Sequence, residues 1–131
     1  MRRLVFALSC AALSCSNQPT EVKVGEEFVL TLGQSVVVSG TEISITFSAV
    51  PQDSRCPVNV VCIWAGNAEV RLTLYGGLPV PEQIAVLNTG LEPRSYDFAR
   101  LELRLLDLTP QPVYDQPQSE LYRARLQIVR K

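Results

Sequence analysis

The stretch that decides the fold is Ile43-Ser44-Ile45-Thr46-Phe47-Ser48-Ala49, in which apolar and polar side chains alternate. Successive side chains of a β-strand point to opposite faces of the sheet, so this alternation predicts a strand with one buried face and one solvated face. Pro51 follows two residues later. Because proline cannot donate a hydrogen bond to a strand ladder, we expect the strand to end there.

Similar short apolar or alternating stretches lie on both sides of this strand, separated by Gly, Pro and Asn residues that favour turns. The predicted strands cover 27–32, 36–38, 43–49, 70–75, 84–87, 101–108 and 121–129. A helix over 96–108 is an alternative, but the apolar positions there fit a period of two better than 3.6. The pattern therefore predicts an all-β fold, an antiparallel two-sheet β-sandwich of immunoglobulin-like architecture, with a small barrel as the alternative.

The composition excludes several classes of function. The chain has 131 residues, enough for one domain, and it contains no histidine. A Ser-His-Asp triad, a Cys-His pair and all histidine-based zinc sites are therefore excluded. Twelve basic and thirteen acidic residues give a net charge of -1, without the excess of positive charge typical of nucleic-acid binding. We expect a monomer that is not an enzyme, with no cofactor and no nucleic-acid partner.

The N-terminal residues have the features of an export signal. Arg2 and Arg3 precede an apolar run over 4–13 that is too short to span a bilayer. The run ends in Ala12-Leu13-Ser14-Cys15, which resembles the lipobox of bacterial lipoproteins, where the cysteine is lipidated and becomes the mature N-terminus. Cys10 ends a second copy, but cleavage there would leave an apolar run of only about six residues. We therefore prefer Cys15; the alternative is an ordinary secretory signal cut nearby.

This interpretation divides the chain into a signal peptide over 1–14, a polar tether over 15–23 and a single β domain over 24–131. Loss of Arg2 and Arg3 with the signal leaves ten basic and thirteen acidic residues, a net charge of -3. The acyl chains on Cys15 would anchor the protein in a lipid bilayer, because more than one buried chain gives stable attachment. The expected location is the bacterial cell membrane or the outer membrane, on its periplasmic or surface face.

The most unusual segment contains the two remaining cysteines. It reads Asp53-Ser54-Arg55-Cys56-Pro57-Val58-Asn59-Val60-Val61-Cys62-Ile63-Trp64-Ala65-Gly66. Exported proteins meet an oxidising compartment, so we predict a disulfide between Cys56 and Cys62. A closed loop of about seven residues contributes roughly 2.4 kcal/mol, so its main effect would be to hold the loop rigid. The alternative is a metal site, in which the two thiolates and carboxylates such as Asp53 or Glu69 hold zinc or copper.

Asp53, Arg55 and Trp64 form the candidate partner-binding loop. Arg55 either pairs with Asp53 across the turn or presents its guanidinium to a partner. An exposed pair contributes less than about 1 kcal/mol, so pairing would not prevent Arg55 from reaching outward. We expect Trp64 to stack on the disulfide or to plug the end of the sandwich, with an exposed recognition aromatic as the alternative.

The pattern D-S-R-C-P, four variable residues, then C-x-W-x-G resembles a motif of small exported bacterial proteins of undefined function, which are often lipoproteins. The stretches Leu108-Thr109-Pro110-Gln111-Pro112 and Tyr122-Arg123-Ala124-Arg125 are also similar to theirs, so the likeness covers about 28–129. The resemblance implies a compact β domain with a disulfide. It implies no reaction, and it assigns no role to the residues of the motif.

The expected function is therefore a membrane-anchored, non-catalytic binding or structural module of the cell envelope that presents its disulfide loop. One alternative is an inhibitor of a secreted or envelope hydrolase, and a second is metal handling through Cys56 and Cys62. A glycosidase pair such as Asp53 and Glu69 has no support from the pattern around it. The basic C-terminal residues suit either contact with anionic lipid or protection of a sheet edge; they are Arg123, Arg125, Arg130 and Lys131.

Overall fold

The computed structural model describes residues 19–131, so the predicted signal, Cys10 and Cys15 lie outside the described residues. The described chain forms nine strands. They are β1 (Thr20–Val22), β2 (Glu27–Thr31), β3 (Ser35–Val38), β4 (Ser44–Asp53), β5 (Ala68–Tyr75), β6 (Gln83–Asn88), β7 (Ser95–Phe98), β8 (Leu101–Thr109) and β9 (Arg123–Arg130). Within residues 19–131, no helix is long and apolar enough to cross a membrane.

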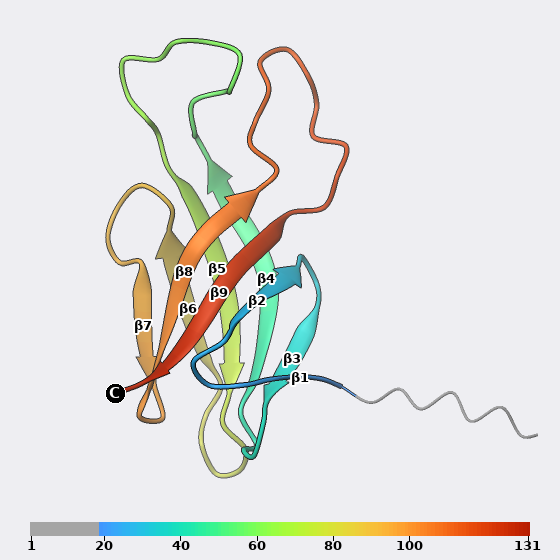
Figure 1. Cartoon of the computed structure of the whole chain (residues 1–131), viewed down its shortest axis with the longest axis vertical. Helices are drawn as coiled ribbons and strands as arrows, with labels where there is room; N and C mark the ends of the chain where they lie inside the picture. The colour runs from blue at the N-terminus through green and yellow to red at the C-terminus, as the bar shows by residue number, and fades with distance from the viewer. Residues whose placement is uncertain (1–18) are drawn as a thin grey trace, which may run out of the picture.

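The strands form two sheets that pack face to face (Figure 1). One sheet has five strands in the order β1-β3-β4-β5-β6, and the other has four in the order β2-β9-β8-β7. All neighbours are antiparallel except β1 and β3. The two sheets do not close into a barrel, so the predicted β-sandwich is confirmed over its alternative.

The core lies between the sheets and consists of the inward side chains of alternating strands. In β5, Val70, Leu72 and Leu74 are buried, whereas Arg71 between them is exposed. β9 buries Leu126 and its neighbours two residues away in the same manner. Phe47 of the deciding stretch is fully buried. Burial of such apolar area is the main favourable contribution to folding.

The structure corrects three details of the predicted strands. β4 continues through Pro51 to Asp53, because its pairing with β5 shifts register between Ala49 and Gln52. Pro51 lies in this irregular segment, where its missing N–H removes no ladder bond. β7 was not predicted from the sequence, and β1 occupies part of the segment predicted as a tether.

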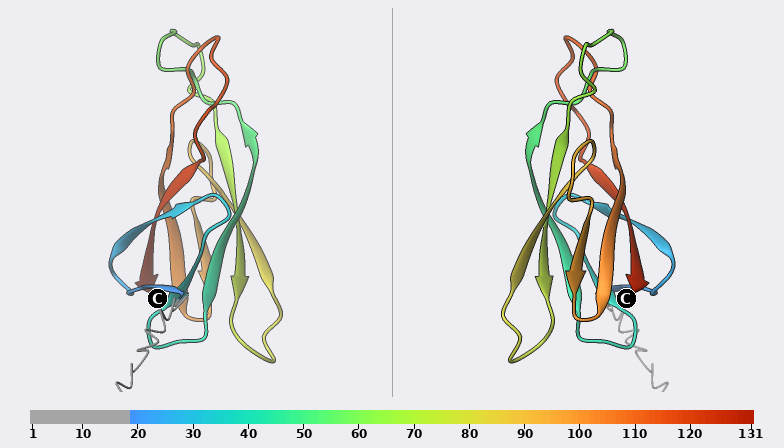
Figure 2. Two further views of the ribbon diagram at one scale, coloured as in Figure 1. Left: turned by 90° about the vertical axis from the view of Figure 1, so that its right-hand side faces the viewer. Right: turned by 90° about the vertical axis from the view of Figure 1, so that its left-hand side faces the viewer.

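The two ends of the sandwich differ in their connections (Figures 1 and 2). Two long segments extend from one end: the cysteine loop, residues 54–67 between β4 and β5, and the Gln/Pro loop, residues 110–122 between β8 and β9. β1, the short β7–β8 turn and the C-terminus lie toward the opposite end. The candidate site is therefore far along the strands from the point where the described chain begins.

Candidate functional site

The cysteine loop and the Gln/Pro loop lie side by side and are joined by backbone hydrogen bonds. The amide of Val58 donates to the carbonyl of Pro112 over 3.0 Å. Asn59 binds both backbone groups of Tyr114: its Oδ1 accepts from the Tyr114 amide over 2.7 Å, and its Nδ2 donates to the Tyr114 carbonyl over 3.5 Å. Two segments about fifty residues apart thus form one surface, as the views in Figure 2 show.

Arg55 fixes the base of both loops. Its guanidinium makes a bidentate pair with Asp53, with Nε to Oδ1 at 2.8 Å and Nη2 to Oδ2 at 2.7 Å. It also donates to the carbonyls of Leu108 over 2.6 Å and Pro110 over 2.9 Å, at the end of β8. The hydroxyl of Tyr122 donates to Asp53 Oδ2 over 2.9 Å. One buried ion pair therefore joins β4, β8 and the approach to β9.

The charge state of Asp53 follows from these contacts. Burial by itself raises the pKa of Asp53, but hydrogen bonds from Arg55 and Tyr122 together outweigh burial and leave the pKa below its ordinary value. Burial, followed by the hydrogen bond to Asp53, raises the pKa of Tyr122. Asp53 is thus held as a carboxylate and Tyr122 as a neutral phenol at neutral pH.

A second polar cluster closes the other end of the cysteine loop. Ser54 bonds to Asn67 through both its amide and its hydroxyl, at 2.7 and 2.9 Å from the Asn67 carbonyl. The buried side chain of Asn67 donates to Asn88 Oδ1 over 2.9 Å. Gly66 has a φ of +73°, and a Cβ atom there would collide with the backbone carbonyl of Ser54. The glycine of the motif is therefore required by close backbone approach.

The predicted disulfide is confirmed. Cys56 and Cys62 are bonded to each other, with their Cα atoms 5.9 Å apart. The amide of Cys56 also donates to the carbonyl of Ala65 over 2.9 Å, so the loop is tied across its width at two levels. Because each sulfur is bonded to the other, neither is present as a thiolate ligand for a metal. Residues 19–131 contain no group of three or more His, Cys, Asp or Glu placed to hold a metal ion.

The outer part of the cysteine loop exposes large apolar side chains and carries no charge from residue 56 to residue 67. We name these side chains the apolar tip: Val58 at 65% exposure, Val61 at 102%, Ile63 at 93% and Trp64 at 82%. Tyr114 of the neighbouring Gln/Pro loop is 65% exposed. Single exposed apolar residues are ordinary, but several on one stapled loop indicate an interaction surface.

Two expectations for this loop are therefore wrong. Arg55 does not face outward: it is 8% exposed, because its pair with Asp53 is buried and two backbone carbonyls hold the remaining N–H groups. Trp64 neither stacks on the disulfide nor plugs the sandwich, since 82% of its surface is exposed. Of the three candidate residues, the structure leaves Trp64 free to meet a partner and uses Asp53 and Arg55 as internal supports.

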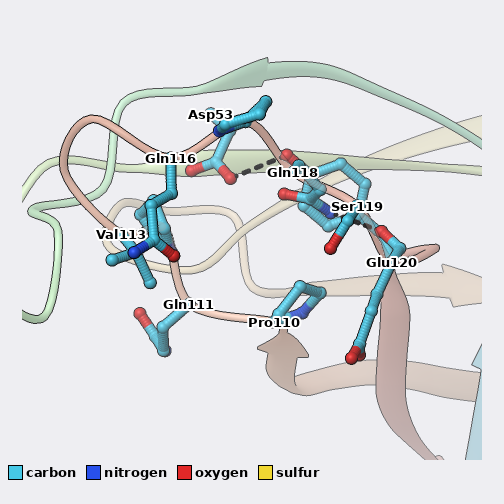
Figure 3. A pocket seen from close by; sticks show the side chains of 11 residues that line it. Asp53, Pro110, Gln111, Val113, Gln116, Gln118, Ser119 and Glu120 are labelled. Atoms are coloured by element: carbon cyan, nitrogen blue, oxygen red, sulfur yellow. Dashed lines mark hydrogen bonds between the residues drawn. The ribbon is translucent and has the colours of Figure 1, made fainter.

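A hollow of about 310 Å³ lies between Asp53, Tyr122 and the Gln/Pro loop (Figure 3). Its lining is rich in proline and in glutamine amides, with Asp53 and Glu120 as its carboxylates. Both Asp53 oxygens already accept hydrogen bonds from Arg55 and Tyr122. This arrangement supplies amide groups for hydrogen bonding, but its best-placed carboxylate is already engaged.

The sequence gave no warning that the Gln/Pro loop forms half of the site. One signal was present: the D-S-R-C-P motif shares its likeness with the stretches that contain Leu108, Pro110 and Tyr122, and these are the residues that Arg55 and Asp53 contact. Asp53 and Arg55 are also two residues apart, which places their side chains on the same side of an extended chain.

Comparisons of the chain with protein-family models, with curated proteins and with solved structures give no match. The arguments for function therefore rest on the geometry of the two loops and on the sequence.

Proposed function

We propose that this protein is an exported lipoprotein of the bacterial cell envelope, anchored through Cys15, that acts as a non-catalytic binding module and presents the apolar tip to a protein partner. The observation that carries the proposal is the exposure of Trp64 and its apolar neighbours on a loop that is otherwise fixed by internal bonds. Function commonly resides in loops that a rigid scaffold positions.

The composition of the apolar tip suits a protein interface. Tryptophan is among the residues that contribute most to binding energy at interfaces, particularly where neighbouring apolar contacts exclude water from it. Val61 and Ile63 lie close to Trp64 in the sequence and are almost fully exposed. Burial of these side chains in a partner's groove would remove a continuous apolar surface from water.

The internal bonds of the loop reduce the entropy that binding must cost. The Cys56–Cys62 disulfide and the hydrogen bonds from Val58 and Asn59 to the Gln/Pro loop restrict the backbone before any partner arrives. Loops that are already ordered lose less conformational freedom on association. The buried Arg55–Asp53 pair supports the same loop from below.

The position of the loop is also favourable. The chain can extend at most about 18 Å over the five residues from Cys15 to Thr20. β1 begins at the end of the sandwich opposite the apolar tip (Figure 1). Anchoring at Cys15 would therefore keep that end near the bilayer and direct the apolar tip away from it.

Affinity capture from an envelope extract tests the proposal. The bait is the purified mature protein, compared with a Trp64→Ala, Ile63→Ser variant and with Leu78→Ala as a matched control. Leu78 is 87% exposed and lies in the β5–β6 turn at the opposite end. A protein retained by wild type and control but lost with the tip variant is expected. Identical sets of captured proteins for all three baits would refute the role of the tip.

One observation also favours a hydrolase inhibitor as a second candidate. The cysteine loop projects beyond the end of both sheets and is stapled at its base (Figure 2). A projecting, rigid loop is suited to insertion in an active-site cleft. Assays of secreted proteases and lysozymes with added wild-type protein would detect it, and the Trp64→Ala variant should then inhibit less.

A further inference from the structure

A second surface of interest lies at the other end of the sandwich, where β1, the β3–β4 turn, the β7–β8 turn and the end of β9 meet. It is a hollow of about 500 Å³ whose charged lining residues are Arg100, Arg130 and Lys131, with no carboxylate side chain among its lining residues. Val24, Ile43 and Leu101 supply an apolar part of its wall. We name this the cationic hollow. It combines positive charge with apolar surface in a protein whose expected mature form is acidic.

Two of the three cations in the cationic hollow have no carboxylate partner within residues 19–131. The Lys131 ammonium contacts the carboxylate of Asp97. Neither Arg100 nor Arg130 takes part in an ion pair in the described part of the chain. Their guanidinium groups have five N–H donors each, in a planar arrangement that matches phosphate oxygens.

The backbone at Arg100 is strained. Ala99 and Arg100 form the two-residue turn between β7 and β8, with φ of +48° and +64°. A hairpin turn with two positive φ angles strongly favours Asn and Gly, which occupy that region at little cost. Side chains held in this conformation against their preference are often ones that bind something. An arginine here keeps a guanidinium beside Arg130 where a glycine would fold more easily.

The cationic hollow is also next to the point where the described chain begins. Ser39 of its lining donates its amide to the carbonyl of Val22 in β1 over 2.8 Å. Val24 of its wall is nine residues after Cys15. This step rests on the proposed function, because a lipid on Cys15 would hold the hollow close to a bilayer surface.

We infer that the cationic hollow binds the phosphodiester of an anionic phospholipid headgroup in the membrane that anchors the protein. Arg100 and Arg130 would hold the phosphate oxygens, and the apolar wall would contact the glycerol region. Each arginine near an anionic bilayer surface strengthens attachment about fivefold. The result would be a domain that stands on the membrane, with the apolar tip at the far end.

Arginine footprinting tests this inference in the mature lipidated protein. The protein is reconstituted in vesicles of phosphatidylcholine, with or without phosphatidylglycerol, and treated with phenylglyoxal, and the modification of each arginine is measured by mass spectrometry. We expect Arg100 and Arg130 to react at least about fivefold more slowly when phosphatidylglycerol is present. Arg71 is the internal control, because it is exposed on the outer face of β5 and has no ion pair within residues 19–131.

Two further arms make the outcomes distinct. Arg100→Gly removes the charge and relieves the backbone strain, so it should fold at least as well as wild type while Arg130 loses its protection. Inorganic phosphate added to phosphatidylcholine vesicles tests a free anion as the ligand. Equal rates with and without phosphatidylglycerol, equal slowing of Arg71, or full protection by inorganic phosphate alone would overturn the inference. Failure of the protein to sediment with phosphatidylcholine vesicles would contradict anchoring instead.

Discussion

The guanidinium of Arg55 and the carboxylate of Asp53 form a bidentate ion pair, two residues apart, with side chains only 7% and 12% exposed. Both residues belong to the motif that the sequence singles out, and both are structural. Through Leu108, Pro110 and Tyr122 the pair ties the cysteine loop to the Gln/Pro loop. The pair therefore supports the surface that carries Trp64 and leaves the contact with a partner to that side chain.

Arg55→Ala is expected to lower the free energy of unfolding by about 3 kcal/mol, because it leaves the Asp53 carboxylate and two backbone carbonyls without their donor. Urea unfolding at pH 7 measures the change. Arg104→Ala is the matched control, since Arg104 pairs with Glu102 at an exposed site, where the loss should be below about 1 kcal/mol. Equal losses for the two variants would contradict the structural role of Arg55.

Tyr122→Phe is expected to weaken the dependence of stability on acid pH. The pKa of Asp53 is lowered in the folded protein, so its contribution is present above the unfolded pKa and is lost as the pH falls through the folded pKa. Removing the Tyr122 hydrogen bond brings the folded pKa of Asp53 closer to its ordinary value. Urea unfolding between pH 7 and pH 2 should show a smaller acid loss for the variant than for wild type. An unchanged pH profile would exclude the bond between Tyr122 and Asp53.

Gly66→Ala is expected to destabilise the fold far more than Gly40→Ala. Both glycines have φ above +70°, so each substitution carries the strain of a left-handed alanine, about 1 kcal/mol. A Cβ at Gly40 meets nothing within 4 Å, whereas one at Gly66 collides with the Ser54 carbonyl. The loss at Gly66 should reach about 3 kcal/mol or more in thermal or urea unfolding. Similar losses at both positions would show that the close approach is absent.

The mature protein is expected to begin at a lipidated Cys15. Intact mass spectrometry of protein extracted from membranes gives the cleavage position and the acyl mass together. Cys15→Ser should release the protein from the lipidated fraction, whereas Cys10→Ser should leave the mature mass unchanged. A mature chain that starts at Cys10, or one without acyl chains, would refute the predicted anchor.

The strands were largely predictable from the sequence because their signal is local. Ile43 to Ala49 and Val70 to Leu74 alternate in polarity, and that alternation is set by burial of one face of each sheet. β7 has only four residues and begins after Pro93, which is too short a stretch for the pattern to stand out. Pro51 was misjudged because a local shift in the β4–β5 register, visible only in the paired strands, accommodates it.

The site was predictable in its covalent part and not in its packing. The disulfide followed from the number of cysteines that export leaves. The burial of Arg55 depends on carbonyls of Leu108 and Pro110, more than fifty residues away, and no local pattern reports such a contact. The exposure of Trp64 also runs against the usual preference of tryptophan for burial. A large apolar side chain held outside the core is the feature that the proposed function uses.

Photo-crosslinking in living cells tests the central claim most directly. Benzoylphenylalanine is placed at Trp64 in the apolar tip or at Leu78 in the turn at the opposite end, both of which are exposed. The account predicts a discrete protein adduct on irradiation when the probe replaces Trp64 and no such adduct when it replaces Leu78. The absence of an adduct at Trp64, or the same adduct from both positions, would contradict it.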